Sequence, residues 1–242
     1  MEKIRINRAL ALAGVASRRG AETLVRAGRV RLNGRIVTEL ATLVDPRRDK
    51  LAVDGKPLTL AQPAYYLFHK PRGLIATQHD EHGRPCVGDV CGRLPGAPQP
   101  VGRLDRPSEG LMLLTNDGEL ANRLMHPRYE VRKRYQVTVQ PRLTARHVKQ
   151  ALAGIELEDG PARLLELEVS AEESQRSWLT VTISEGRNRL IRRLFEALGY
   201  EVLRLKRVQL GALNLGKLGV GQTRPLSASE AASLRASVAL DK

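Results

Sequence analysis

Beyond residue 64, hydrophobic and polar positions follow a pattern that predicts strands separated by helices. Two continuous apolar runs, at 65–68 and 111–114, predict strands that are buried on both faces, because a strand with one solvated face would alternate. Further segments with the composition and alternation of strands lie at 135–139, 164–169, 178–183 and 202–208. The sequence therefore predicts a sheet in this part of the chain.

Helical spacing occurs in three segments between these strands. In 117–125, Leu120 and Leu124 share one face, and Pro127 follows the predicted end. Thr144 caps a helix over 144–153 that Gly154 closes, and Gly199 closes a helix over 187–198. This order of elements favours an α+β domain with a mainly antiparallel sheet and flanking helices.

The first 58 residues predict a small α/β module. Ile6, Leu10 and Ala13 have helical spacing and end at Gly14. Ser17 begins a second helix, which stops at Gly28. Asn33-Gly34 lies between the apolar segments 30–32 and 35–37, a strong hairpin pattern, and Asp54-Gly55 predicts another tight turn. With a linker at 59–64, we expect two domains, 1–60 and 61–242.

The net charge of +14 indicates a polyanionic partner. Thirteen basic and six acidic residues give the first sixty residues half of this charge, so positive charge is densest there. Nucleic acid is the usual partner of such a chain, and an anionic membrane is the alternative, but no basic amphipathic helix with an aromatic and leucine face is evident. Without a signal peptide or a transmembrane segment, we expect a cytoplasmic protein, a monomer by default.

Two cysteines and two histidines lie close together between residues 79 and 91. The spacing of His79, His82, Cys86 and Cys91 matches no recognised metal-ligand pattern, and the surrounding residues predict a loop. We therefore expect no metal site and no disulfide, and no Walker loop or dinucleotide fingerprint indicates a cofactor.

A candidate catalytic carboxylate lies in the segment 101–111, ahead of a buried strand. Asp105 is flanked by Arg103 and Arg106, and such a carboxylate stays ionised at neutral pH. It could act as a nucleophile or as an electrostatic stabiliser, but is a poor general acid. On these residues alone, a structural ion pair remains the commoner explanation.

Two further segments combine cations with features of a binding site. Four arginines within 187–193 lie where a helix is expected to begin, a position that favours anions. In the segment 131–135, Tyr135 follows three cations at the start of a strand, and an aromatic ring beside cations suits an unpaired base with its phosphates. An exposed basic helix and a half-buried strand tyrosine are the plain structural alternatives.

The first module resembles the S4 RNA-binding domain. The resemblance rests on Gly14-Val15-Ala16-Ser17-Arg18-Arg19, Ala27-Gly28-Arg29-Val30 and Val30-Arg31-Leu32-Asn33-Gly34. Two cations in the first turn of a helix are disfavoured by its dipole, which indicates an external anion near Arg18 and Arg19. The resemblance implies that five arginines face RNA: Arg8, Arg18, Arg19, Arg29 and Arg31.

The rest of the chain resembles the pseudouridine synthases, in the ribosomal RsuA/RluB branch whose members carry an S4 domain ahead of the catalytic domain. Four motifs in consistent order carry this resemblance: Lys70-Pro71-Arg72-Gly73, Gly102-Arg103-Leu104-Asp105 with Gly110-Leu111, Lys133-x-Tyr135, and Gly186-Arg187-x-Arg189-x-Ile191-Arg192-Arg193. Leu190 and Ser108 depart from the pattern, where glutamine and threonine are common.

The resemblance implies a role for each matched residue. Asp105 matches the nucleophile, Tyr135 the tyrosine that stacks on the base and can assist proton transfer, and Arg192 the cation that pairs with the aspartate. Ile191, Arg103 and Lys70 are expected around the base pocket. Arg187 and Arg189 are expected to bind RNA.

The expected reaction breaks a C–N glycosidic bond, turns the uracil and rejoins it through carbon, without any cofactor. A base in a duplex must first be flipped out. Asp105 would attack the sugar carbon or stabilise charge while a proton leaves the sugar. The resemblance implies ribosomal RNA or a ribosome-assembly intermediate as the partner. Residues 115–127 resemble the large-subunit enzymes of the family more than the small-subunit ones, which implies 23S RNA rather than 16S. The alternatives are a non-catalytic RNA-binding protein, an assembly factor that retains activity, and a hydrolase that releases free uracil.

Overall fold

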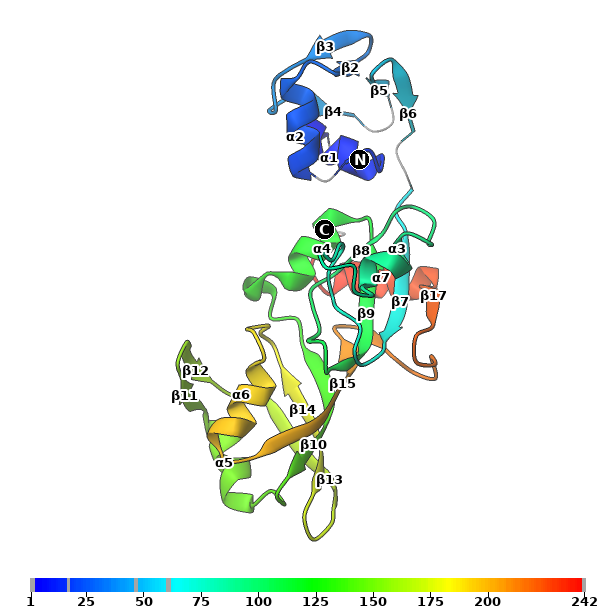
Figure 1. The fold of residues 1–242 in the computed structure, drawn as a ribbon. Helices are drawn as coiled ribbons and strands as arrows, with labels where there is room; N and C mark the ends of the chain where they lie inside the picture. Colours follow the sequence, from blue (N-terminus) through cyan, green and yellow to red (C-terminus); the bar gives the residue numbers. More distant parts are fainter. Residues whose placement is uncertain (1–2, 17, 46–47, 60–61, 241–242) are drawn as a thin grey trace. The chain divides into compact units, whose positions relative to one another are not determined.

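The chain divides into two compact units (Figure 1). The computed structural model describes residues 3–16, 18–45, 48–59 and 62–240. The smaller unit comprises the residues up to Ala64 together with Pro95–Ala97, and the larger unit comprises the remainder. Among the described residues, no helix has both the length and the apolar character that crossing a bilayer requires.

The smaller unit packs two helices against short antiparallel strands. Its core is formed by Ile6, Leu10, Val25 and Val30, all fully buried. The elements are α1 (Ile6–Leu12) and α2 (Arg18–Arg26), a pair formed by β1 (Ile4–Arg5) and β4 (Leu43–Val44), and a four-stranded sheet in the order β3 (Arg35–Val37), β2 (Val30–Leu32), β5 (Leu51–Val53) and β6 (Lys56–Leu58).

Both predicted turns of the smaller unit are confirmed. Asn33 and Gly34 have φ angles of 51° and 84° between β2 and β3, and Asp54 and Gly55 have φ angles of 50° and 78° between β5 and β6. Positive φ at both central residues is what a two-residue hairpin turn requires. The predicted cap at Ser17 falls outside the described residues.

A nine-stranded, mostly antiparallel sheet organises the larger unit, as the sequence predicts. The only parallel pairing within it, among the described strands, joins β15 to β9. The main path is β13 (Glu166–Glu172), β14 (Ser177–Ile183), β10 (Lys133–Gln140), β15 (Glu201–Leu210), β9 (Glu109–Thr115), β7 (Tyr65–Lys70) and β17 (Thr223–Pro225), while β16 (Leu213–Asn214) pairs with β15 and β8 (Gln99–Pro100) with β9.

Strand β9 is buried on both faces, which confirms the prediction from its continuous apolar run. Met112 and Leu114 belong to one hydrophobic cluster, and Leu111 and Leu113 to another. Period-two alternation directs these pairs to opposite faces of the sheet. The first cluster includes residues of α3 (Val87–Cys91), α5 (Ala145–Ala153) and α6 (Leu190–Ala197), and the second includes residues of α4 (Gly118–Met125) and α7 (Ala228–Ala236).

Two expectations about local structure were wrong. The helix expected over 187–198 begins only at Leu190, because Arg189 adopts a left-handed conformation with φ of 49°. The cysteine segment is not a loop throughout: Cys86 precedes α3, Cys91 ends it, and both thiols are buried. The spacing also gave no indication of α7, of the one-turn helix Pro127–Tyr129, or of the hairpin formed by β11 (Ile155–Leu157) and β12 (Gly160–Ala162).

Strands β9 and β15 approach each other very closely at Gly110. A Cβ atom at this position would lie 2.2 Å from the Arg207 carbonyl oxygen, and Gly110 has a φ angle of 113°. Only glycine combines this conformation with so close a backbone contact. The residues that precede β9 are therefore held beside the middle of β15.

Candidate active site

A loop ahead of β9 carries Asp105 and is fixed by backbone hydrogen bonds at both ends. The Ser108 amide donates to the Asp105 carbonyl at 2.9 Å, which closes a turn, and the Gly73 amide donates to the Arg106 carbonyl at 2.7 Å. The Arg106 side chain donates back to the Gly73 carbonyl at 3.3 Å. The segment Lys70–Gly73 therefore holds the Asp105 loop, although the two are more than thirty residues apart in sequence.

Lys70 lies behind this loop with its side chain completely buried. Its ammonium group donates to the carbonyl oxygens of Ser108 at 2.9 Å, Pro71 at 3.1 Å and Asp105 at 3.3 Å. Burial lowers the pKa of Lys70 to about 8, and the charges of Asp105 and Glu109 partly oppose this shift. The sequence placed Lys70 around the base pocket, whereas the structure places it under the backbone of the Asp105 loop.

One cavity of about 580 Å³ brings together most of the site residues that the sequence predicted in the larger unit. This volume lies within the range of small-molecule sites. Asp105 and Arg103 line the cavity from the loop, Tyr135 from β10, and Arg189 and Ile191 from the region around the start of α6. Arg103 and Arg189 are exposed, so they are available to a ligand with phosphate groups.

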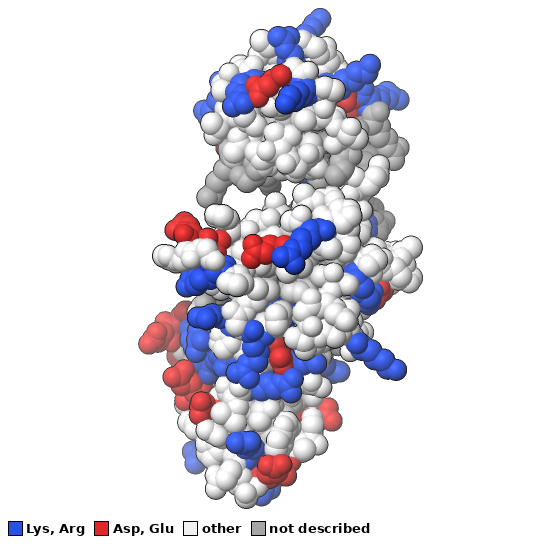
Figure 2. All heavy atoms as spheres, turned by 45° about the vertical axis from the view of Figure 1, so that its right-hand side comes forward, with Lys and Arg blue, Asp and Glu red and all other residues white. Residues whose placement is uncertain are grey.

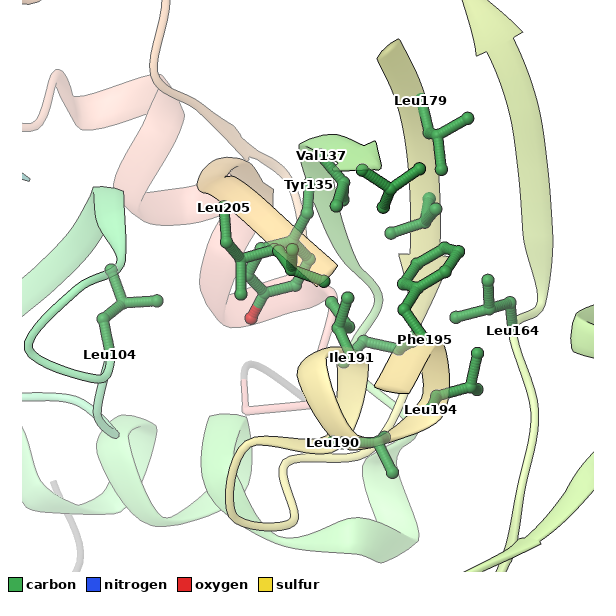
Figure 3. Close-up of a cluster of buried hydrophobic side chains, with 14 of the residues drawn as sticks. Leu104, Tyr135, Val137, Leu164, Leu179, Leu190, Ile191, Leu194, Phe195 and Leu205 are labelled. Carbon is green, nitrogen blue, oxygen red and sulfur yellow. The ribbon is translucent and has the colours of Figure 1, made fainter. Parts of the chain in front are cut away.

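Tyr135 is held firmly in the cavity wall. In the sheet, Tyr135 pairs with Val181 on β14 on one side and with Arg207 on β15 on the other, and only 7% of its surface is exposed. Figure 3 shows its ring beside Leu205, with the hydroxyl oxygen pointing away from Phe195 and toward the side on which Leu104 lies. The ring is thus a rigid surface against which a planar group can stack.

Arg192 makes no direct ion pair with Asp105 within the described residues. Its guanidinium donates to the Val202 carbonyl at 2.8 Å and to the Pro107 carbonyl at 3.5 Å. Burial lowers the pKa of Arg192, the charge of Arg189 adds to this effect, and the charge of Asp105 opposes it. Arg192 therefore contacts the backbone of the Asp105 loop at Pro107 rather than the Asp105 carboxylate.

Arg187 is occupied by contacts within the protein. It donates to Glu185 at 2.6 Å, to Asp159 at 3.0 Å, and to the carbonyl oxygens of Gly160 and Pro161. Arg193 also binds Asp159, at 2.8 Å. Arg187 still lines the cavity, and these contacts fix the segment before α6 to the β11–β12 hairpin.

The described residues include no group of three His, Cys, Asp or Glu side chains that could hold a metal ion. His79 and His82 are exposed, whereas the neighbouring thiols are buried. The cavity itself is lined by a carboxylate, several cations and an aromatic ring.

Family comparisons identify this arrangement. A model described as RNA pseudouridylate synthase matches residues 64–197, more than half of the chain, and a model described as S4 domain matches residues 4–51. The chain belongs to the RsuA/RluB family of RNA pseudouridine synthases.

Similar proteins extend this family assignment over nearly the whole chain. Ribosomal large subunit pseudouridine synthase B of Bacillus subtilis is 44% identical over 237 residues, covering 96% of each chain. An uncharacterized RNA pseudouridine synthase of Mycobacterium tuberculosis is 45% identical over 241 residues, covering 98% of this chain and 95% of its own. A crystal structure of a pseudouridylate synthase matches with a TM-score of 0.67 and 29% identity, covering 96% of this chain and 99% of its own. This pseudouridine synthase is therefore an RNA-modifying isomerase with an N-terminal S4 domain.

The S4 domain of this synthase places its predicted RNA-binding arginines in different settings. Arg29 is exposed and bound to Asp54, with Nε donating at 2.8 Å, and Arg31 is exposed and donates to the Gly34 carbonyl at 2.9 Å. Arg8 is half-buried in α1, and Arg18 and Arg19 form the start of α2. Their part in RNA binding stays a prediction.

One of the two departures from the family pattern has a structural explanation. Leu190, where glutamine is common, is the first residue of α6 and is 3% exposed in the main hydrophobic cluster. It therefore packs rather than binds. Ser108 is buried and its backbone carbonyl oxygen accepts the shortest bond from Lys70, but its hydroxyl has no hydrogen-bond partner among the described residues, so nothing in the structure explains the serine.

Sequence reasoning missed two cations that line the cavity of the synthase. Lys133, quoted only as part of a motif, donates to the carbonyl oxygens of Val131, Ser184 and Glu185 at 3.2–3.4 Å. Burial lowers the pKa of Lys133 to about 8, and the charge of Arg207 adds to the shift. Arg207 itself is 3% exposed, and no feature of the sequence separates it from the neighbouring Arg204 and Lys206.

Proposed function

We propose that this synthase isomerises one specific uridine of ribosomal RNA, in the 23S RNA of the large subunit, with Asp105 as the nucleophile acting on a flipped-out nucleotide. The observation that carries the proposal is the single cavity that Asp105 and Tyr135 both line. Similar proteins of Bacillus subtilis, Yersinia pestis and Salmonella typhi are each named ribosomal large subunit pseudouridine synthase B, which supports the choice of RNA.

In this proposal, one unit binds RNA and the other catalyses the reaction. We assign RNA binding to the domain 1–60, with its S4 resemblance, and catalysis to 61–242. The flipped uracil stacks on Tyr135 and Ile191 borders it, while Arg103 and Arg189 meet the flanking phosphates. Stacking of about 1–3 kcal/mol per base offsets part of the cost of extruding the nucleotide.

In the proposed step, the Asp105 carboxylate bonds to the anomeric carbon of the ribose while the bond from that carbon to N1 breaks. The freed uracil turns and bonds through C5, and the carboxylate leaves. The C5 proton goes to solvent and N1 gains a proton, so the atoms of the uridine are rearranged without oxidation or reduction. Lys70 and Arg192 hold the loop so that the carboxylate keeps its position during both displacements.

Mapping pseudouridine on ribosomal RNA that lacks the modification tests this proposal. Purified protein, as the monomer that we propose, is incubated with 23S or 16S RNA, naked or partly assembled, and pseudouridine is located by carbodiimide labelling and primer extension. We expect one new stop, on 23S RNA. A stop on 16S RNA would contradict the choice of subunit, and release of free uracil without a stop would indicate a hydrolase. A non-catalytic RNA-binding protein would give neither product.

A further inference from the structure

Arg207 combines nearly complete burial with a place in the wall of the active-site cavity. It lies on β15, is 3% exposed, and lines the same cavity as Asp105 and Tyr135. Its Nε donates to the Leu111 carbonyl oxygen at 2.7 Å, and its Nη2 has no hydrogen-bond partner among the described residues. A buried guanidinium N–H without a partner is costly, so its retention beside a cavity calls for an explanation.

The sheet directs Arg207 toward the reacting groups. Tyr135 and Arg207 are register partners on β10 and β15, so their side chains leave the sheet on the same face. Across the parallel pairing, Arg207 faces Gly110, which follows the Asp105 loop by a few residues. Arg207 therefore lies between β10, which carries Tyr135, and β9, which follows the Asp105 loop.

The charges around Arg207 leave it without a dedicated carboxylate partner. Glu109, its nearest acidic neighbour along β9, is engaged by Arg204 at 2.6 Å. Among the described lining residues, Asp105 is the only acidic one, whereas Arg103, Lys133, Arg187, Arg189 and Arg207 are basic. The cavity thus has an excess of positive charge, which would stabilise a ligand group that acquires negative charge during a reaction.

We propose that Arg207 is a further catalytic residue, whose Nη2 donates a hydrogen bond to a carbonyl oxygen of the target uracil and stabilises the negative charge that the ring acquires. This inference rests on the proposed function. When the bond from the anomeric carbon to N1 breaks, its electron pair stays with the uracil and is delocalised onto O2 and O4. The same electrons then form the new bond from C5 to the anomeric carbon, so the negative charge is transient and Arg207 remains protonated throughout.

Such a role follows the physics of oxyanion stabilisation. A charged donor that is already fixed in a water-poor site stabilises developing charge without reorganising during the reaction. The Nε bond to Leu111 and the pairing of β15 on both sides supply that fixed geometry. Lys133, beside it in the same wall, adds to the positive field.

A comparison of two substrates separates this role from a structural one. Single-turnover cleavage of the glycosidic bond is followed by nuclease digestion and mass spectrometry, on RNA with uridine or 5-fluorouridine at the target position. Fluorine withdraws electrons and so stabilises the uracil anion by itself, which makes the anion depend less on a hydrogen bond from Arg207. We expect Arg207→Gln to slow the uridine reaction roughly 10²- to 10³-fold, the usual effect of losing one oxyanion donor, and to slow the fluorinated substrate far less.

Binding and folding are measured on the same proteins. We expect the RNA affinity of Arg207→Gln to stay within about threefold of wild type, since the bond strengthens in the transition state. Lys206→Gln removes the adjacent charge on the opposite face of β15 and serves as the matched control, with wild-type rates on both substrates. Equal slowing on both substrates, or no slowing of Arg207→Gln, would overturn the inference.

If Arg207→Gln does not fold, the wild-type enzyme decides the question by itself. Sulfur accepts hydrogen bonds weakly, so RNA with 2-thiouridine or 4-thiouridine lacks one of the two carbonyl acceptors. We expect one of these substrates to react roughly tenfold more slowly than uridine, and equal rates on all three would overturn the inference. A wild-type enzyme that converts no uridine would contradict the proposed function itself, whereas an active wild type with an equally active Arg207→Gln would contradict only the role of Arg207.

Discussion

The rigidity of Tyr135 makes its contribution to binding measurable. Because the residue is paired on both sides within the sheet, its ring loses little freedom when a base stacks on it. We expect Tyr135→Ala to weaken RNA binding by about 1–3 kcal/mol, while Tyr135→Phe, which keeps the ring, retains wild-type affinity. Fluorescence anisotropy with a labelled target RNA measures both constants. Equal affinities for wild type and Tyr135→Ala would exclude stacking.

The buried ammonium of Lys70 predicts a pH dependence of stability. Burial lowers its pKa from 10.5 to about 8. Between these values the unfolded chain binds more protons than the folded chain, so the contribution of Lys70 to the free energy of unfolding rises with pH. It is flat well below pH 8, where Lys70 is protonated in both states.

The variant Lys70→Met isolates this titration from the other ionisable groups. We expect the free energy of unfolding of wild type minus that of Lys70→Met to rise by about 1 kcal/mol from pH 8 to pH 9. Urea denaturation at a series of pH values measures the difference. Lys149→Met, which removes a lysine from the exposed surface of α5, is the matched control. A pH-independent difference for Lys70→Met would mean that Lys70 is not a buried cation.

At the level of elements, the sequence predicted what local patterns determine. The Asn33-Gly34 hairpin follows from two residues that tolerate positive φ, and β9 follows from its apolar run. The start of α6 could not be predicted, because arginine rarely adopts the left-handed conformation that Arg189 has here and no local pattern indicates it. Helix α7 did carry a pattern, since Ser227 and Glu230 form a capping box, but its polar surface hides any helical periodicity.

In the candidate site too, residues in local motifs could be predicted, whereas a residue distinguished by its tertiary contacts could not. Asp105, Tyr135 and Ile191 were found from motifs, and the structure brings them to one cavity. Arg207 was missed because it is distinguished by its burial and by its neighbours on adjacent strands. The local sequence, a run of cations and apolar residues, reveals neither.

The close contact between β9 and β15 predicts a strong effect of a single methyl group. In Gly110→Ala, the new Cβ meets the Arg207 carbonyl oxygen at 2.2 Å and the backbone keeps a φ angle that alanine disfavours. We expect a loss of about 2–5 kcal/mol in the free energy of unfolding. Gly118→Ala, with no atom within 4 Å of its Cβ, is the control and should stay near wild type in the same urea titration. Comparable stability of the two variants would contradict the strand geometry described above.

On the scale of the whole molecule, positive charge is present on both units, as the face drawn in Figure 2 also shows. The S4 resemblance implies that the charge at the start of α2 contacts RNA. Replacing Arg18 and Arg19 together by Gln should therefore weaken binding and reduce the slope of log affinity against log salt by about 1.4–1.8.

A second double variant, which loses the same charge on the larger unit, controls for long-range electrostatic attraction between protein and RNA. Arg146 and Lys149 lie on the exposed face of α5, and their double replacement by Gln removes the same net charge. We expect this control to leave the salt slope close to wild type. If both double variants changed the slope equally, general attraction rather than contact at α2 would explain RNA binding.

The nucleophilic role of Asp105 is the central claim, and release of tritium from RNA labelled at C5 of uridine tests it most directly, because isomerisation sends that hydrogen to solvent. Asp105→Asn keeps the shape of the side chain and removes its charge, and Glu158→Gln, exposed on the turn between β11 and β12, is the matched control. We predict that Asp105→Asn binds the RNA with wild-type affinity and releases no tritium, while Glu158→Gln releases it at the wild-type rate. Tritium release by Asp105→Asn at a rate near that of wild type would contradict the account.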